Sequence, residues 1–157
     1  MNLSNIRKLD LKNHLYYVFF LLVMIIPILN NKFVVGTLVN FILVTSYFKF
    51  GLKKSIVLSI FPSIFAVYFN ILPIVMISVI PFIILSNFIL LYSLNILKNL
   101  NFKSKIFISL FLKIIFLYAV GIFYMNFDNK LFFSLVSMHQ LITALFSGIL
   151  AWIFLRN

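Results

Sequence analysis

Two strongly polar residues, His139 and Gln140, stand side by side in a segment from Leu131 to Leu155 that carries no formal charge. At about 1.5 Å per residue, a helix over this segment would be roughly 37 Å long, enough to cross a bilayer with some tilt. An imidazole and an amide are costly to expose to lipid. The pair, together with Thr143 one turn later, therefore predicts a buried polar site.

Four other residues with polar groups fall at membrane depth in apolar segments: Asn40, Asn87, Lys113 and Tyr118. A lone asparagine in such a segment either joins two helices by a hydrogen bond or contacts a solute, and both interpretations stay open. Lys113 lies eight residues beyond Lys105, so its ammonium either reaches back to the interface or forms an interior cation. Tyr118 is expected near the mouth of a site. All seven residues named so far are candidate solute-binding residues.

Several kinds of catalytic and energising residues are missing from the chain. It has no cysteine, only two acidic residues, Asp10 and Asp128, and no acidic residue within an apolar segment. A proton or sodium relay of the usual carboxylate type therefore lacks its groups, and no G-x-x-x-x-G-K-[ST] phosphate loop or H-E-x-x-H metal motif is present. A histidine without acidic or thiolate neighbours gives little support for a metal. We expect no enzyme, no cofactor and no metal site, and uphill transport would need another polypeptide.

The elements that would position these residues are predicted to be transmembrane helices. Hydrophobic residues make up 64% of the 157 residues, and the mean hydropathy of +1.20 lies far outside the soluble range. The pattern predicts an all-α integral membrane protein with a single domain over residues 1–157. Six transmembrane helices are predicted at 14–29, 33–48, 55–70, 74–97, 105–126 and 131–155. The turn between helices three and four is placed at Asn70 to Pro73, and Pro62 and Pro81 are predicted to lie inside those helices as kinks.

The basic residues predict an orientation. Ten of the 13 Lys and Arg residues fall at the two ends of the chain and in the second and fourth connections, whereas the opposite side has Lys32 and Lys130. The positive-inside rule then places both termini in the cytoplasm. The net charge of +11 does not favour nucleic-acid binding, because the aromatic residues lie within apolar runs instead of a solvated basic surface.

Small residues gather on one side of the last predicted helix, where Ala144, Ser147, Gly148 and Ala151 fall four or fewer residues apart. Such a face lets neighbouring helices approach closely. The face can serve close packing within the bundle, and it can equally dock the protein into a larger membrane complex.

The chain resembles the substrate-binding S components of energy-coupling-factor (ECF) vitamin transporters. The similarity rests on three segments, Gly36 to Asn40, Ile80 to Asn87 and Gln140 to Gly148, and on the six-helix plan. The resemblance implies a solute-binding subunit in a bacterial cell membrane that captures a small vitamin-like molecule from outside. It also implies a partner transmembrane coupling subunit and two ATPase subunits that drive uptake. A non-transporting structural subunit of a larger complex is the alternative, and the identity of the solute stays open.

Overall fold

The computed structural model describes residues 3–29, 31–69, 74–125 and 138–156, with side chains from residues 11–29, 31–69, 77–123 and 140–156. The described backbone is helical almost throughout. Its elements, in chain order, are α1 Leu3–Ile25, η1 Ile26–Leu29, α2 Lys32–Phe50, α3 Leu52–Tyr68, η2 Ile74–Val79, α4 Ile80–Ile96, η3 Leu97–Asn99, α5 Phe102–Met125 and α7 Met138–Arg156, where η marks a 3₁₀ segment.

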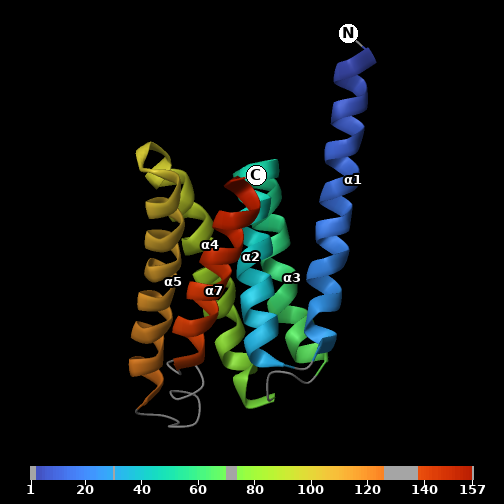
Figure 1. The fold of residues 1–157 in the computed structure, drawn as a ribbon. Helices are drawn as coiled ribbons and strands as arrows, with labels where there is room; N and C mark the ends of the chain where they lie inside the picture. Colours follow the sequence, from blue (N-terminus) through green and yellow to red (C-terminus); the bar gives the residue numbers. More distant parts are fainter. Residues whose placement is uncertain (1–2, 30, 70–73, 126–137, 157) are drawn as a thin grey trace.

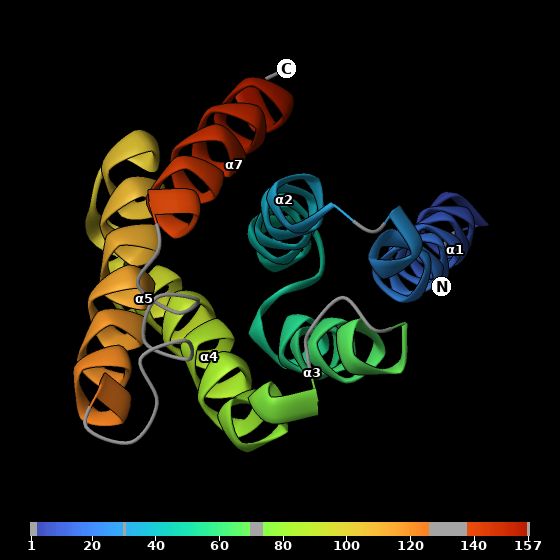
Figure 2. The ribbon, with the colours of Figure 1, turned by 90° about the horizontal axis from the view of Figure 1, so that it is seen from below.

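Successive helices run in opposite directions, so that both termini lie at the same end of the bundle (Figure 1). Viewed along the bundle, α2, α3, α4, α5 and α7 form a ring, in which each helix packs on the next, and α1 lies outside it against α2 and α3 (Figure 2). Fully buried leucines fill the middle of the ring, among them Leu43, Leu90 and Leu94. This ring positions the polar residues.

Within the described residues, four helical segments are long and apolar enough to cross a membrane: Leu11–Leu29, Lys32–Phe50, Ile77–Asn99 and Phe102–Phe123. Gln140–Arg156 is a shorter apolar helix. The all-α prediction is therefore confirmed, whereas six membrane crossings and cytoplasmic termini remain predictions.

Local residue chemistry explains where two of the helices begin and end. Asn31 caps α2, because its side-chain oxygen accepts hydrogen bonds from the backbone N–H groups of Phe33 and Val34 at 3.0 and 3.2 Å. Gly51 alone separates α2 from α3, with φ of +83°, a conformation that glycine adopts without a steric penalty. The second connection is thus a single residue.

The proline positions differ in part from the predictions. Pro62 lies inside α3, as expected, but Pro81 is at the start of α4 and not in its interior. Proline is well suited to the first turn of a helix, where its missing N–H costs nothing. The predicted helix over 74–97 consequently consists of a 3₁₀ segment followed by α4. Near Pro27, the first α-helix similarly gives way to the 3₁₀ segment η1.

Two predicted features fall partly outside the described residues. The break at Asn70 to Pro73 lies there, between the end of α3 at Tyr68 and the start of η2 at Ile74. Residues 131–137 of the last predicted helix lie there as well, and the described helix α7 begins at Met138.

Candidate functional site

Three polar side chains from three helices meet in the centre of the ring. The ammonium nitrogen of Lys113, on α5, donates hydrogen bonds to the side-chain oxygens of Asn40 on α2 and Asn87 on α4, each at 2.6 Å. The three residues expose only 6%, 4% and 1% of their surface, respectively. We call these three residues the Lys113 network.

A fourth helix holds the network in place. The amide nitrogen of Asn87 donates a hydrogen bond to the backbone carbonyl oxygen of Ser59, on α3, at 3.1 Å. This bond orients the amide so that its oxygen faces the ammonium of Lys113. The network therefore connects α2, α3, α4 and α5 through directional hydrogen bonds.

The position of Lys113 answers a question that the sequence leaves open. Eight residues separate it from Lys105, which corresponds to about 12 Å along the helix axis. Its side chain does not extend back to the end of the bundle, because its nitrogen is held between two buried amides. Lys113 is thus an interior residue and does not snorkel to the surface.

The charge of Lys113 has no carboxylate partner among the described side chains, which include no aspartate or glutamate. An ammonium group has three N–H donors, and the two amide oxygens accept two of them. Two strong hydrogen bonds to neutral oxygens offset only part of the cost of burying a cation. The remaining donor is available to an additional acceptor.

Two buried hydroxyl groups close to the network along the chain have no hydrogen-bond partner among the described residues. Ser109 lies one turn before Lys113 on α5, and Thr37 lies three residues before Asn40 on α2. Residues at these spacings share a helix face. Unpartnered buried polar atoms are rare and call for water, an ion or a ligand as partner. The sequence analysis did not single out either hydroxyl, although the spacing to Lys113 and Asn40 is visible in the sequence.

Among the described side chains, the other predicted site residues form no hydrogen bond with the Lys113 network. Thr143 is buried, and its hydroxyl donates to the backbone oxygen of Gln140 at 3.0 Å, while Gly36 of α2 lies close to its methyl group. Gln140 is half-buried, and Tyr118 is 49% exposed on α5. His139 is in the first turn of α7, and its side chain lies outside the described residues. The structure thus unites three of the seven candidates.

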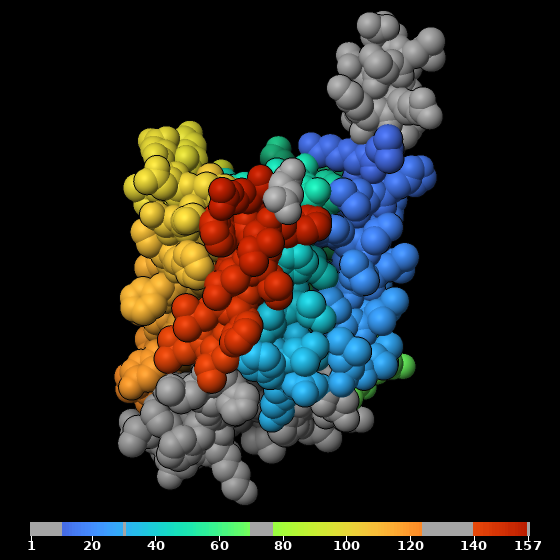
Figure 3. Space-filling model, viewed as in Figure 1, coloured from blue at the N-terminus to red at the C-terminus, as the bar shows by residue number. Residues whose placement is uncertain are grey.

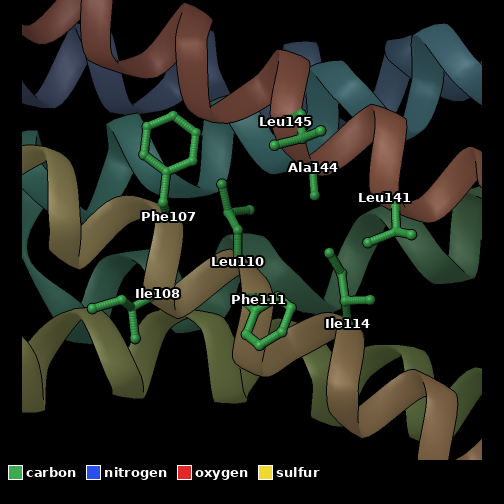
Figure 4. Close-up of a pocket in the computed structure, with 8 residues that line it drawn as sticks. All are labelled: Phe107, Ile108, Leu110, Phe111, Ile114, Leu141, Ala144 and Leu145. Atoms are coloured by element: carbon green, nitrogen blue, oxygen red, sulfur yellow. The ribbon is translucent and has the colours of Figure 1, made fainter.

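A hollow lies between α5 and α7, and Lys113 is not among the residues that line it (Figure 4). Its volume is about 430 Å³, and all its lining side chains are apolar. We call it the α5–α7 groove. It is lined by Phe107, Ile108, Leu110, Phe111 and Ile114 of α5 and by Leu141, Ala144 and Leu145 of α7.

The small residues of α7 lie against neighbouring helices, as their spacing predicts. Ala144, Ser147, Gly148 and Ala151 are all buried. A Cβ atom added to Gly148 would come within 2.9 Å of the Phe107 ring, so α7 packs directly against α5 at this glycine. Close contact of this kind is the role of small residues between membrane helices.

No cluster of three or more potential metal ligands occurs among the described residues. Comparisons of the chain with protein-family models, curated proteins and solved structures give no match.

Proposed function

We propose that the protein is a membrane-embedded solute-binding subunit of an ECF-type importer, which captures a small vitamin-like molecule from outside the cell. The observation that supports this most directly is the Lys113 network in the core of an apolar bundle. An ionisable residue in the interior of a membrane protein is retained at a substantial energetic cost, and such residues commonly mark binding or transport sites.

In this proposal, the third N–H donor of Lys113 and the hydroxyls of Ser109 and Thr37 bind polar groups of the solute. The ammonium favours a solute that presents an acceptor-rich or negatively charged group, because such a group would complete its coordination in a medium of low dielectric constant. Asn40 and Asn87 would hold the ammonium in position. Gln140, Thr143 and His139 would contact the solute along the path into the bundle, and Tyr118 would act at its outer surface.

The source of energy would be external. The chain has no phosphate-binding loop and no acidic residue in an apolar segment, so a transmembrane coupling subunit and two ATPases would drive release on the inside. The distribution of basic residues supports an orientation in the cell membrane with both termini in the cytoplasm.

A structural subunit of a larger membrane complex is the second candidate, and a specific observation favours it. The ammonium of Lys113 already has two short hydrogen bonds, and the groove beside α5 has an apolar lining. In that case, the network would only fix the packing of four helices.

The two candidates are separated by purifying the intact protein from its native membrane and identifying retained small molecules and co-purifying proteins by mass spectrometry. We expect a solute to be retained by the wild type and by Lys98→Met, which removes an exposed lysine at the end of α4. Lys113→Met should lose the solute while keeping its helical circular dichroism and its partner proteins. Retention by Lys113→Met, or partner proteins without any solute in the wild type, would favour the structural role.

A further inference from the structure

Two cations share one aromatic ring at the end of the bundle where α5 begins and α7 ends. The ammonium of Lys103 lies 4.2 Å from the ring centre of Trp152, and the guanidinium carbon of Arg156 lies 5.6 Å from the same centre. Both cations are exposed. The indole ring attracts each of them, so both charges lie beside the same ring.

These two charges lack a carboxylate to balance them within the described part of the chain, whose side chains include no acidic residue. The whole protein has 13 basic and two acidic residues, so most of its cations have no carboxylate of this chain to pair with. At a membrane surface, the anions at hand are lipid phosphates, which attract basic residues at helix ends and in basic pockets between helices.

The α5–α7 groove lies between the same two helices that carry this basic pair, nearer the middle of the bundle. Phe107, which lines the groove, follows Lys103 by one turn, or about 6 Å along the axis. On α7, Trp152 follows Gly148 by one turn, and Gly148 packs directly against Phe107. The cations and the groove therefore occupy the same seam between two helices, with the cations at its end.

The shape and lining of the groove fit a hydrocarbon chain. Figure 3 shows α7 (red) crossing one face of the bundle beside α5 (orange), so the seam between them is on the outer surface. Phe111 and Leu145 line the groove and are more than half exposed. A groove with no polar lining offers nothing to a polar solute, whereas it matches an acyl chain that comes from the surrounding bilayer.

We propose that the seam between α5 and α7 binds one anionic phospholipid, whose phosphate lies between Lys103 and Arg156 and whose acyl chain fills the α5–α7 groove. The charge pair selects the headgroup, and the groove selects a molecule with a chain. The inference is independent of the proposed transport function, because it uses none of the residues in the Lys113 network.

The test is native mass spectrometry of the purified, delipidated full chain titrated with palmitoyl-oleoyl phosphatidylglycerol or with the zwitterionic phosphatidylcholine of the same chains. We expect preferential binding of the anionic lipid. The double variant Lys103→Gln/Arg156→Gln should bind it about 30-fold more weakly, because each basic residue near anionic lipid contributes about fivefold to the affinity. Equal affinity for the two lipids in the wild type would overturn the proposal.

Two further variants separate specific binding from general attraction to the basic end. Lys12→Gln/Lys53→Gln removes the same charge from exposed positions on α1 and α3, away from the groove, and should change the affinity less than threefold. A loss equal to that of the seam variant would contradict a defined site.

Leu145→Trp adds bulk to an exposed position in the groove and should weaken binding of the anionic lipid while leaving the melting temperature unchanged. Unchanged lipid binding by this variant would exclude the acyl-chain part of the site. Glycerol phosphate, which has the headgroup charge but no chains, should not displace the lipid. Displacement by millimolar glycerol phosphate would assign the basic pair to a soluble phosphate.

Discussion

Helix α5 has two buried sides that differ in chemistry. On one side, Lys113 is held by two short hydrogen bonds to amides from α2 and α4. On the other, Phe107, Leu110 and Ile114 meet α7 through apolar contacts that leave a groove of about 430 Å³. Both sides pack against helices of similar hydrophobicity, yet only the first makes directional contacts.

The difference shows what polar groups contribute to packing in an apolar bundle. Lipid tails and side chains such as leucine are equally apolar, so contact between apolar side chains gives little preference for one helix rotation over another. A buried ammonium tolerates few arrangements, because each of its donors needs an acceptor. The Lys113 network therefore fixes how α5 is turned, and the groove remains where apolar side chains do not interlock.

The largest effect is expected when both hydrogen-bond acceptors of Lys113 are removed from the polar side of α5. Asn40→Leu/Asn87→Leu would leave the ammonium of Lys113 buried without either partner, and we expect a loss of about 3–5 kcal/mol in the free energy of unfolding. Adding Lys113→Met to that pair should restore most of the loss, because an apolar trio needs no acceptors. SDS titration in mixed micelles measures both. If the triple variant were no more stable than the double variant, the buried charge of Lys113 would not be the cause of the loss in stability.

A smaller effect is expected on the apolar side, where Gly148 of α7 packs directly against α5. Gly148→Ala would place a Cβ atom 2.9 Å from the Phe107 ring and 3.0 Å from a Leu110 methyl carbon, whereas Gly36→Ala would meet Thr143 at 3.3 Å. Both substitutions raise the helix propensity by the same amount. The difference between their free energies of unfolding therefore measures the contact that the added Cβ atom makes. We expect Gly148→Ala to be less stable than Gly36→Ala by about 1–2 kcal/mol in the same titration. Equal stability would mean that the seam is looser than the structure indicates.

The smallest effect is expected at Tyr118, on the exposed surface of α5. Tyr118→Phe removes only a hydroxyl from a side chain that is 49% exposed, so the free energy of unfolding should change by less than about 0.5 kcal/mol. Retention of a solute, measured by mass spectrometry of the purified protein, should fall only slightly, because Tyr118 would act at the outer surface and not in the Lys113 network. A clear loss of solute with unchanged stability would move the binding site from the Lys113 network toward the surface of α5.

The sequence predicted the helical segments well because charged and polar connections mark their ends. Asn31, for example, supplies a capping oxygen, and Gly51 supplies a backbone conformation that few other residues adopt. Pro81 was assigned to a helix interior because the apolar run continues through it. A change from 3₁₀ to α-helix within such a run leaves no trace in hydropathy.

The sequence indicates how deep each candidate residue lies in the apolar segments. It does not indicate which way each residue faces around its helix axis. A helix that is apolar all round gives no periodic pattern from which its inward face can be read. The sequence thus placed Asn40, Asn87, Lys113 and Thr143 at similar depth, but it did not show that the first three meet. The Thr143 hydroxyl donates its hydrogen bond to the backbone of its own helix. A threonine in a helix always has this alternative, and residue spacing alone does not show whether it is used.

The one-residue link at Gly51 has a mechanical consequence. Its span of only a few ångströms ties the end of α2 to the start of α3, so these two helices form a hairpin that cannot separate at that end. Asn40 is on one arm of the hairpin, and the Ser59 carbonyl that steers Asn87 is on the other. Any motion that shifts the Gly51 end of α2 would therefore carry the start of α3 along, so the arms that hold Asn40 and the Ser59 carbonyl would move together at that end.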